Sequence, residues 1–173
     1  SVGGSSAGGN MALSLSARLG SERIKSCFAL YPAAHLTHPE RLDTVMGCVS
    51  DKFRSGVVIP HWCMKLFINA YTTPGTDMND PRLSPMFYDA SKFPKYVAVA
   101  CGDADTLYRM SFDLMKKISG SASGTNVDGS RKFICVLNEA HEFNTFGRTR
   151  ASQEERDRVE GEAINMIRAS WRQ

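Results

Sequence analysis

Residues 96–105, YVAVACGDAD, decide the fold class, because they join an apolar run of strand length to a Gly-Asp turn. A continuous apolar run predicts a strand that is buried on both faces, which is typical of a parallel sheet. The surrounding sequence repeats this arrangement, with a helix expected over about 106–118 and further apolar strands over 27–32 and 132–137. Strands that alternate with helices predict an α/β fold, a mostly parallel sheet flanked by helices.

Three further helices are expected outside this central part. One covers 11–20 and ends at Gly20, and another covers 61–71. The last covers 152–171, where Ser152 and the glutamate three residues on form a capping box with Ser152 as the N-cap.

The composition excludes several classes of protein. Of 173 residues, 42% are hydrophobic and 23% are charged, an ordinary globular composition. The net charge is only +3 and no long basic run occurs, so no nucleic-acid partner is expected. No stretch approaches the roughly 20 apolar residues that span a bilayer. Five cysteines without zinc spacing predict no metal site and favour a reducing, cytoplasmic location.

Residues 4–8, GSSAG, fit the G-x-S-x-G pattern of a nucleophile elbow. In such an elbow a tight strand-to-helix turn exposes the serine, here Ser6, and the glycines leave room for the turn. The backbone N–H of Ala7 would then stabilise an oxyanion. A helix begins directly after the motif, as an elbow requires. The alternative is a flexible Gly/Ser-rich linker.

A serine nucleophile needs a base and a carboxylate that orients the base. Elbow hydrolases supply them in the chain order Ser, Asp or Glu, His, and Asp105 and His141 follow Ser6 in that order, each just beyond a predicted strand. Asp103 competes with Asp105, although it could instead cap the next helix. The other histidines are expected to be surface or capping residues: His35, His38 and His61.

Four motifs carry a resemblance to a known family. Residues 4–10, GSSAGGN, are similar to the GDSAGGN elbow of the hormone-sensitive-lipase-like family of α/β-hydrolases. DPRLSPMF at 80–87 resembles its DPxxSPL segment, and CGDADTLYR at 101–109 resembles its GExDPLRD turn. EAHEF at 139–143 resembles its HGF turn. The resemblance selects Asp105 over Asp103 and supports His141.

This resemblance implies a serine carboxylic-ester hydrolase of the esterase or lipase type that needs no cofactor. Ser6 would form an acyl-enzyme with a small-molecule ester, His141 would take and return the proton, and Asp105 would hold the imidazole. It divides one catalytic domain into an elbow part over 1–32, part of a helical cap over 33–86, and a part over 87–173 with the acid and the histidine.

The resemblance also suggests where a substrate would lie. Trp62, Leu66, Phe67 and Phe87 are candidates to line an acyl pocket, with ordinary core of cap helices as the alternative. Glu142 stands where the family has glycine, and would narrow the pocket or repel acidic substrates.

The chain looks like the C-terminal half of such a hydrolase, because the family's HGG oxyanion loop and the strands before the elbow are absent from it. The exposed sheet edge would be covered by the missing N-terminal half of the same hydrolase or by a second copy of this chain.

Three other functions remain open at this point. The first is a non-catalytic binding module of the same fold, or an inactive fragment. The second is a peptidase of that fold. The third is a hydrolase that uses Ser1 as an N-terminal nucleophile exposed by self-cleavage.

Overall fold

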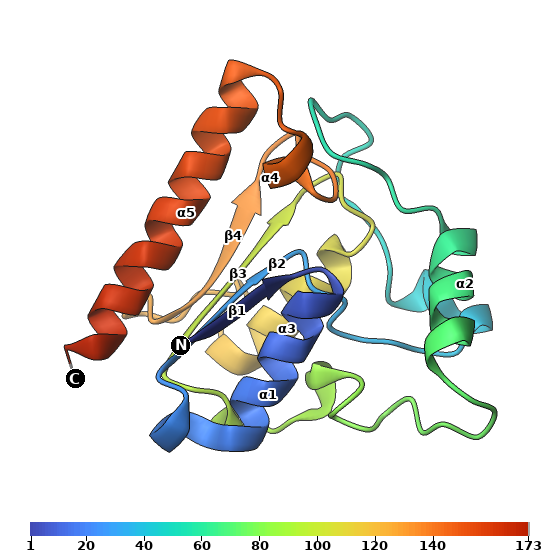
Figure 1. The fold of residues 1–173 in the computed structure, drawn as a ribbon, viewed down its shortest axis with the longest axis horizontal. Coiled ribbons are helices and arrows are strands. Elements are labelled where there is room, and N and C mark those ends of the chain that lie inside the picture. Colours follow the sequence, from blue (N-terminus) through green and yellow to red (C-terminus); the bar gives the residue numbers. More distant parts are fainter. Residues whose placement is uncertain (173) are drawn as a thin grey trace.

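The computed structural model describes residues 1–172 and contains one sheet of four parallel strands (Figure 1). The strands lie in the order β1-β2-β3-β4, so each pairs with its neighbours along the chain: β1 (Val2–Ser5), β2 (Ser26–Leu30), β3 (Tyr96–Gly102) and β4 (Arg131–Val136). The α/β architecture with a parallel sheet is therefore confirmed. On its outer side, β1 pairs with no strand among residues 1–172.

Helices cover both faces of this sheet. The α-helices are α1 (Ala7–Arg23), α2 (His61–Tyr71), α3 (Tyr108–Ser119), α4 (Phe143–Phe146) and α5 (Arg150–Trp171), and the short 3-10 helices are η1 (Pro39–Thr44), η2 (Pro85–Phe87) and η3 (Ala90–Lys92). In Figure 1, α1 and α3 lie on one side of the sheet and α5 on the other. Among residues 1–172, no helix combines the length and the apolar character that crossing a membrane requires.

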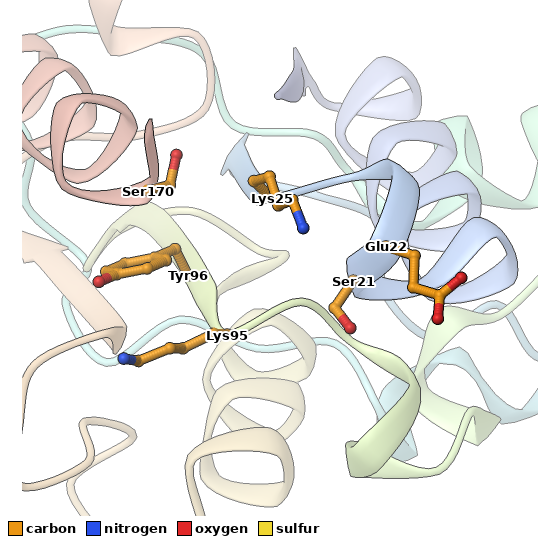
Figure 2. A pocket seen from close by; sticks show the side chains of 6 residues that line it. All are labelled: Ser21, Glu22, Lys25, Lys95, Tyr96 and Ser170. Atoms are coloured by element: carbon orange, nitrogen blue, oxygen red, sulfur yellow. The ribbon is translucent and has the colours of Figure 1, made fainter. Parts of the chain in front are cut away.

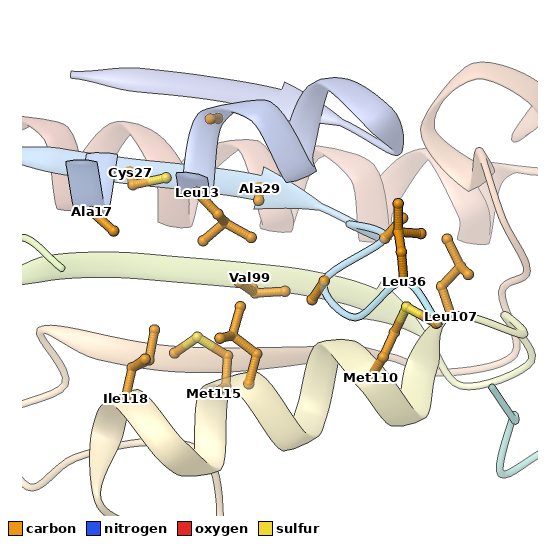
Figure 3. Close-up of a cluster of buried hydrophobic side chains, with 14 of the residues drawn as sticks. Leu13, Ala17, Cys27, Ala29, Leu36, Val99, Leu107, Met110, Met115 and Ile118 are labelled. Carbon is orange, nitrogen blue, oxygen red and sulfur yellow. The ribbon is translucent and has the colours of Figure 1, made fainter. Parts of the chain in front are cut away.

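The central strand β3 shows why both faces need a cover. Its side chains alternate between two cores, as the two-residue period of a strand dictates. Val97 and Val99 join the core beneath α1 and α3, where Leu13 and Leu114 are fully buried (Figure 3). Ala98 and Ala100 join the core beneath α5. The apolar run that predicts a doubly buried strand is thus satisfied on both sides.

Two helix ends refine the sequence predictions. The prediction that a helix ends at Gly20 is supported by the backbone there, since Gly20 has a φ of 73° and interrupts the helical conformation of α1. The predicted capping box of the last helix is wrong. Thr149 is the N-cap of α5, and its hydroxyl oxygen accepts the N–H of Ser152. Ser152 is buried instead, and its hydroxyl donates to Glu139.

Residues 33–86 form an excursion between β2 and β3, with α2 packed against η1 and standing away from the sheet in Figure 1. Both ends of the excursion meet the side chain of Asn10 on α1. Its amide nitrogen donates to the carbonyl oxygen of Ala33 at 2.7 Å and to that of Leu83 at 2.8 Å. One polar side chain therefore holds the start and the end of the excursion beside the first turns of α1.

Candidate active site

Ser6 occupies the sharp turn between β1 and α1. Its φ of 53° is positive, a conformation that costs a non-glycine residue free energy and that often marks functional sites. The N–H of Ser6 donates to the carbonyl oxygen of Leu30 at 2.9 Å, and its own carbonyl oxygen accepts the N–H of Asn10 at 3.0 Å. The turn is thus fixed by β2 on one side and by α1 on the other.

The glycines around Ser6 have different roles. A Cβ on Gly4 would lie 2.5 Å from the backbone carbon and oxygen of Gly8, so position 4 must be glycine. A Cβ on Gly8 would meet no atom within 4 Å among the described residues. The expectation that both motif glycines are needed for space is therefore wrong for Gly8. The closer approach is at Gly9, whose added Cβ would lie 3.1 Å from Pro32.

Three side chains predicted from distant parts of the sequence meet at this turn. The Nε2 atom of His141 lies 3.0 Å from the hydroxyl oxygen of Ser6, and the Nδ1 atom of His141 lies 2.7 Å from Oδ2 of Asp105. Asp105 is completely buried and His141 is 3% exposed. The contacts expected from the sequence are present, with bond lengths suited to proton transfer.

Asp103 and Asp105 form hydrogen bonds with different partners, which distinguishes their roles. The second oxygen of Asp105 accepts the N–H of Leu107 at 2.8 Å, which fixes the carboxylate at the start of α3. Asp103 instead accepts the N–H of Asn138 at 2.8 Å. The alternative in which Asp103 caps the next helix is therefore wrong, because its side chain bonds to the loop after β4.

The backbone N–H of Ala7 lies in the first turn of α1. The first N–H groups of a helix have no acceptor within the helix, and the helix dipole makes this end attractive to negative charge. Because α1 begins at Ala7, directly after Ser6, this N–H is available beside the nucleophile candidate. The geometry is compatible with the oxyanion role expected for Ala7.

Tyr31 belongs to this site, although the sequence analysis did not single it out. Its ring centroid lies 4.4 Å from that of His141, and its hydroxyl donates to Oδ1 of Asn144 at 2.5 Å. Burial raises the pKa of Tyr31 to about 12, against the effect of a hydrogen bond with Ser5. The backbone of Tyr31 also has a positive φ of 36°. Its position near the carboxyl end of the predicted strand 27–32 was the feature of the sequence that could have identified Tyr31 as part of this site.

Glu142 follows His141 directly and lies close to the same group. It has a left-handed backbone (φ 58°) at the N-terminus of α4. Its charge contributes to the raised pKa of Tyr31, after the larger effect of burial. Any influence of Glu142 on a substrate stays a prediction.

The three apolar candidates on α2 are exposed. Trp62, Leu66 and Phe67 are 66%, 57% and 54% exposed, while Met64 and Ile68 form the buried face of the helix. Within residues 1–172 these three residues therefore do not belong to the core. Their role in an acyl pocket stays a prediction.

Phe87 differs from the α2 residues in being half-buried. Its ring packs edge-on against the imidazole of His35, with 5.0 Å between the ring centroids. His35 is therefore half-buried, whereas the sequence predicted a surface or capping residue.

Ser1, the alternative nucleophile, lies at the opposite end of β1 from Ser6. Its hydroxyl oxygen accepts the hydroxyl of Ser26 at 2.7 Å and the indole N–H of Trp171 at 3.4 Å. Ser1 is therefore separated from His141 and Asp105, which contact each other and Ser6, and its role as a nucleophile stays a prediction.

The cavity in Figure 2 also lies at that end of the sheet. It has a volume of about 210 Å³ and opens where β2 and β3 begin, with lining residues Ser21, Glu22, Lys25, Lys95, Tyr96 and Ser170. It is therefore separate from the turn that carries Ser6. Within residues 1–172, no group of three or more His, Cys, Asp or Glu side chains is placed to hold a metal ion.

Comparison with known proteins extends this description. A family model described as "alpha/beta hydrolase fold" matches residues 1–144. No match was found among curated proteins.

Solved structures give the same fold. The chain is similar to EstE1, a thermophilic carboxylesterase cloned from a metagenomic library (TM-score 0.70, 21% identity, 98% of this chain and 54% of that chain). It is also similar to an esterase from the archaeon Pyrobaculum calidifontis (TM-score 0.67, 19% identity, 96% and 51%). A third is brefeldin A esterase, described as a bacterial homologue of human hormone sensitive lipase (TM-score 0.64, 21% identity, 96% and 47%). The chain spans about half the length of these proteins.

Proposed function

This chain belongs to the alpha/beta hydrolase fold family, and from that premise we propose that it carries the catalytic residues of a serine carboxylic-ester hydrolase. The observation that carries the proposal is the continuous hydrogen-bonded row from Ser6 through His141 to the buried Asp105. The resemblance to the hormone-sensitive-lipase-like family and the esterase structures of the same fold support it.

In the proposed reaction, the hydroxyl oxygen of Ser6 attacks the carbonyl carbon of an ester and its proton passes to Nε2 of His141. Asp105 accepts the Nδ1–H of His141, which sets the tautomer and stabilises the imidazolium. The tetrahedral intermediate collapses, and the alcohol leaves with the proton from Nε2. Water then attacks the acyl-enzyme, with His141 again as base, and releases the carboxylic acid and free Ser6.

The N–H of Ala7 is the proposed donor to the negative oxygen of the tetrahedral intermediate. Oxyanion holes in elbow hydrolases have a second N–H donor from a different loop. The resemblance assigns that donor to an HGG loop that this chain does not contain. Because one donor contributes about 10²–10³ in kcat, full activity is expected only when that second donor is supplied.

The proposed substrate is a small-molecule ester, with residues 33–86 forming part of a cap over its acyl group. The exposed Trp62, Leu66 and Phe67 would face the acyl chain or the remainder of the cap, and Phe87 and Glu142 would limit the space near His141. No metal or cofactor is needed for this chemistry.

The outer side of β1 supports a proposal about the partner of this chain. An unpaired strand edge binds other strands readily, and relatives of this fold are about twice as long. We expect an N-terminal segment of the same gene product, or a second copy of the chain, to pair there. Size-exclusion chromatography with light scattering would overturn this expectation by showing a stable monomer of the 173-residue chain alone. A cytoplasmic location, suggested by the free cysteines, is part of the same proposal.

The decisive experiment compares Ser6→Ala with Ser14→Ala in the protein expressed with all the residues that its gene encodes. Ser14 lies on the same helix as the elbow and donates to the carbonyl oxygen of Pro81, away from His141. Hydrolysis of a p-nitrophenyl short-chain ester and labelling by a fluorophosphonate should be lost in Ser6→Ala and kept in Ser14→Ala. Unchanged hydrolysis in Ser6→Ala would contradict the proposal. A wild type that binds esters without turnover would favour the binding-module alternative.

A further inference from the structure

Glu139 has an unusual environment for a carboxylate near a sheet end. Its side chain is completely buried, and three donors reach it from two other parts of the chain. The hydroxyl of Ser152 donates to Oε1 at 2.7 Å, and the Nε–H of Arg54 donates to the same oxygen at 3.2 Å. The hydroxyl of Ser55 donates to Oε2.

These contacts join three segments that are distant in sequence. Arg54 and Ser55 belong to the excursion between β2 and β3, and Ser152 lies in the first turn of α5. Glu139 lies in the loop after β4, two residues before His141. The carboxylate is therefore the point where the excursion, α5 and the histidine loop meet.

Residues 54–57, which we term the strap, also pair with the histidine loop through the backbone. The N–H of His141 donates to the carbonyl oxygen of Val57 at 3.0 Å, and the N–H of Val57 donates to the carbonyl oxygen of His141 at 2.7 Å. Two more backbone bonds extend the ladder, from Arg54 N–H to Asn138 at 2.8 Å and from Ala140 N–H to Ser55 at 3.0 Å. Both backbone polar groups of His141 are therefore bound to the strap.

The strap runs so close to the histidine loop that one position excludes any side chain. Gly56 has a φ of 92°, and a Cβ built on it would lie 2.4 Å from the carbonyl oxygen of His141. The three atoms nearest to this Cβ all belong to the backbone of Ala140 and His141, so no flexible side chain could move away to make room. A displacement of the strap would therefore move the backbone of His141 directly.

We propose that Glu139 is a positioning residue, which holds the strap against the histidine loop and thereby keeps the imidazole of His141 within reach of Ser6. This inference rests on the proposed esterase function. The bond from Asp105 fixes the rotation of the ring, whereas the strap fixes the backbone from which the ring projects. A buried ionic cluster is weak evidence for stability, because apolar side chains of similar volume often replace one without loss. A role in conformational precision explains the cluster better.

The test compares Glu139→Ala, Glu139→Gln and Glu162→Gln in the protein expressed with all the residues of its gene. Glu162 is the matched control: it accepts from Lys132 and joins α5 to β4, but does not touch the strap. Active sites are counted by the stoichiometric burst of a fluorophosphonate or ester reagent, so that kcat refers to folded, reactive protein. Since a shift of about 1 Å costs about 10²-fold, Glu139→Ala should lower kcat about 10- to 100-fold with KM changed less than about threefold.

Glu139→Gln should recover much of this loss, because its amide oxygen still accepts from Ser152 or Arg54 and its NH₂ can donate to the Ser55 oxygen. Glu162→Gln should match the wild type. If Glu139→Ala lowers only the number of titrated sites, or keeps kcat per site, Glu139 is merely structural and the inference is wrong. If Glu139→Ala does not fold, Gly56→Ala and Ser152→Ala perturb the strap and its anchor separately and carry the same expectations.

An NMR measurement tests this inference independently of the proposed function. The proton shared by His141 Nδ1 and Asp105 should give a far-downfield ¹H NMR signal in the wild type. This signal should shift or broaden in Glu139→Ala and stay unchanged in Glu162→Gln. If the wild type hydrolyses no ester, the proposed function fails, and the signal alone still decides the inference. An identical signal in Glu139→Ala and wild type would overturn it.

Discussion

The exchange of Asp105 for asparagine tests the chemistry of the site with the smallest change in shape. In the wild type, Oδ1 of Asp105 accepts the N–H of Leu107 at 2.8 Å, and Oδ2 accepts from Nδ1 of His141 at 2.7 Å. The amide of an asparagine has one oxygen and one NH₂ group in these two places. The oxygen should face Leu107, because the reverse orientation would set the NH₂ group against a buried backbone N–H.

This orientation points the NH₂ group at Nδ1 of His141. Nδ1 must then accept, so the ring proton moves to Nε2, the nitrogen that lies 3.0 Å from the hydroxyl oxygen of Ser6. A protonated Nε2 cannot take the serine proton. The same change of tautomer in a Ser-His-Asp enzyme lowers kcat about 10⁴-fold, and we expect a loss of that size, about 5 kcal/mol of transition-state stabilisation.

The assay is the steady-state hydrolysis of a p-nitrophenyl ester, with Asp103→Asn as the matched control. Asp103 is another buried aspartate of the same turn, but its carboxylate accepts the N–H of Asn138, which an amide oxygen also can do. Asp103→Asn should stay within about threefold of the wild type. The reasoning would be refuted if Asp105→Asn kept more than a tenth of the wild-type kcat while remaining folded by circular dichroism.

Three further predictions concern stability. Leu114→Ala, at a fully buried position beneath the sheet, should lower the free energy of unfolding in urea by about 2–5 kcal/mol, and a loss below 1 kcal/mol would contradict the described core. Gly4→Ala should lower the melting temperature strongly because its Cβ would meet the Gly8 backbone at 2.5 Å, whereas Gly8→Ala should change it little; equal effects would disprove this contrast. Tyr31 keeps its proton in the folded protein up to about pH 12, so its contribution to stability is complete below the unfolded pKa near 10 and is lost as the pH rises from 10 to 12. Between pH 10 and pH 12 the free energy of unfolding of Tyr31→Phe, measured in urea titrations, should therefore fall by up to about 3 kcal/mol less than that of the wild type. Equal falls in the two proteins would refute the raised pKa of Tyr31.

The elements that the sequence predicts well are those with a local physical signature. The apolar run of β3 identifies a buried strand without reference to the rest of the chain. Ser6, Asp105 and His141 were found because each follows or precedes such an element at a defined place in the motif order. Parallel strands then bring these places to one edge of the sheet. Chain order alone left Asp103 as a competitor, and the resemblance to the hormone-sensitive-lipase-like family selected Asp105.

The parts that escaped prediction depend on contacts between distant segments. Nothing near Glu139 in the sequence indicates that Ser55 and Ser152 will donate to it, since those partners arrive from a loop and from another helix. The N-cap of α5 was misplaced for the same reason: Ser152 fits a capping box locally, but its hydroxyl is taken by Glu139. Competition between a local and a long-range partner is decided only in three dimensions.

The two hydrogen bonds from Asn10 to the ends of the excursion have a consequence for how this protein can change during evolution. Because the carbonyl oxygens of Ala33 and Leu83 both accept from the side chain of Asn10, the stretch between them begins and ends at neighbouring points beside α1. Doubling the length of a flexible loop whose ends are held together costs only about 0.6 kcal/mol in closure entropy. Exposed segments of this stretch can therefore lengthen, shorten or be exchanged at small cost, provided that its buried residues, such as Leu42, Met64 and Ile68, stay in the core and that residues 54–57 keep their place beside His141. Under the proposed function, substrate preference could then diverge among descendants of this chain while Ser6, His141 and Asp105 keep their places.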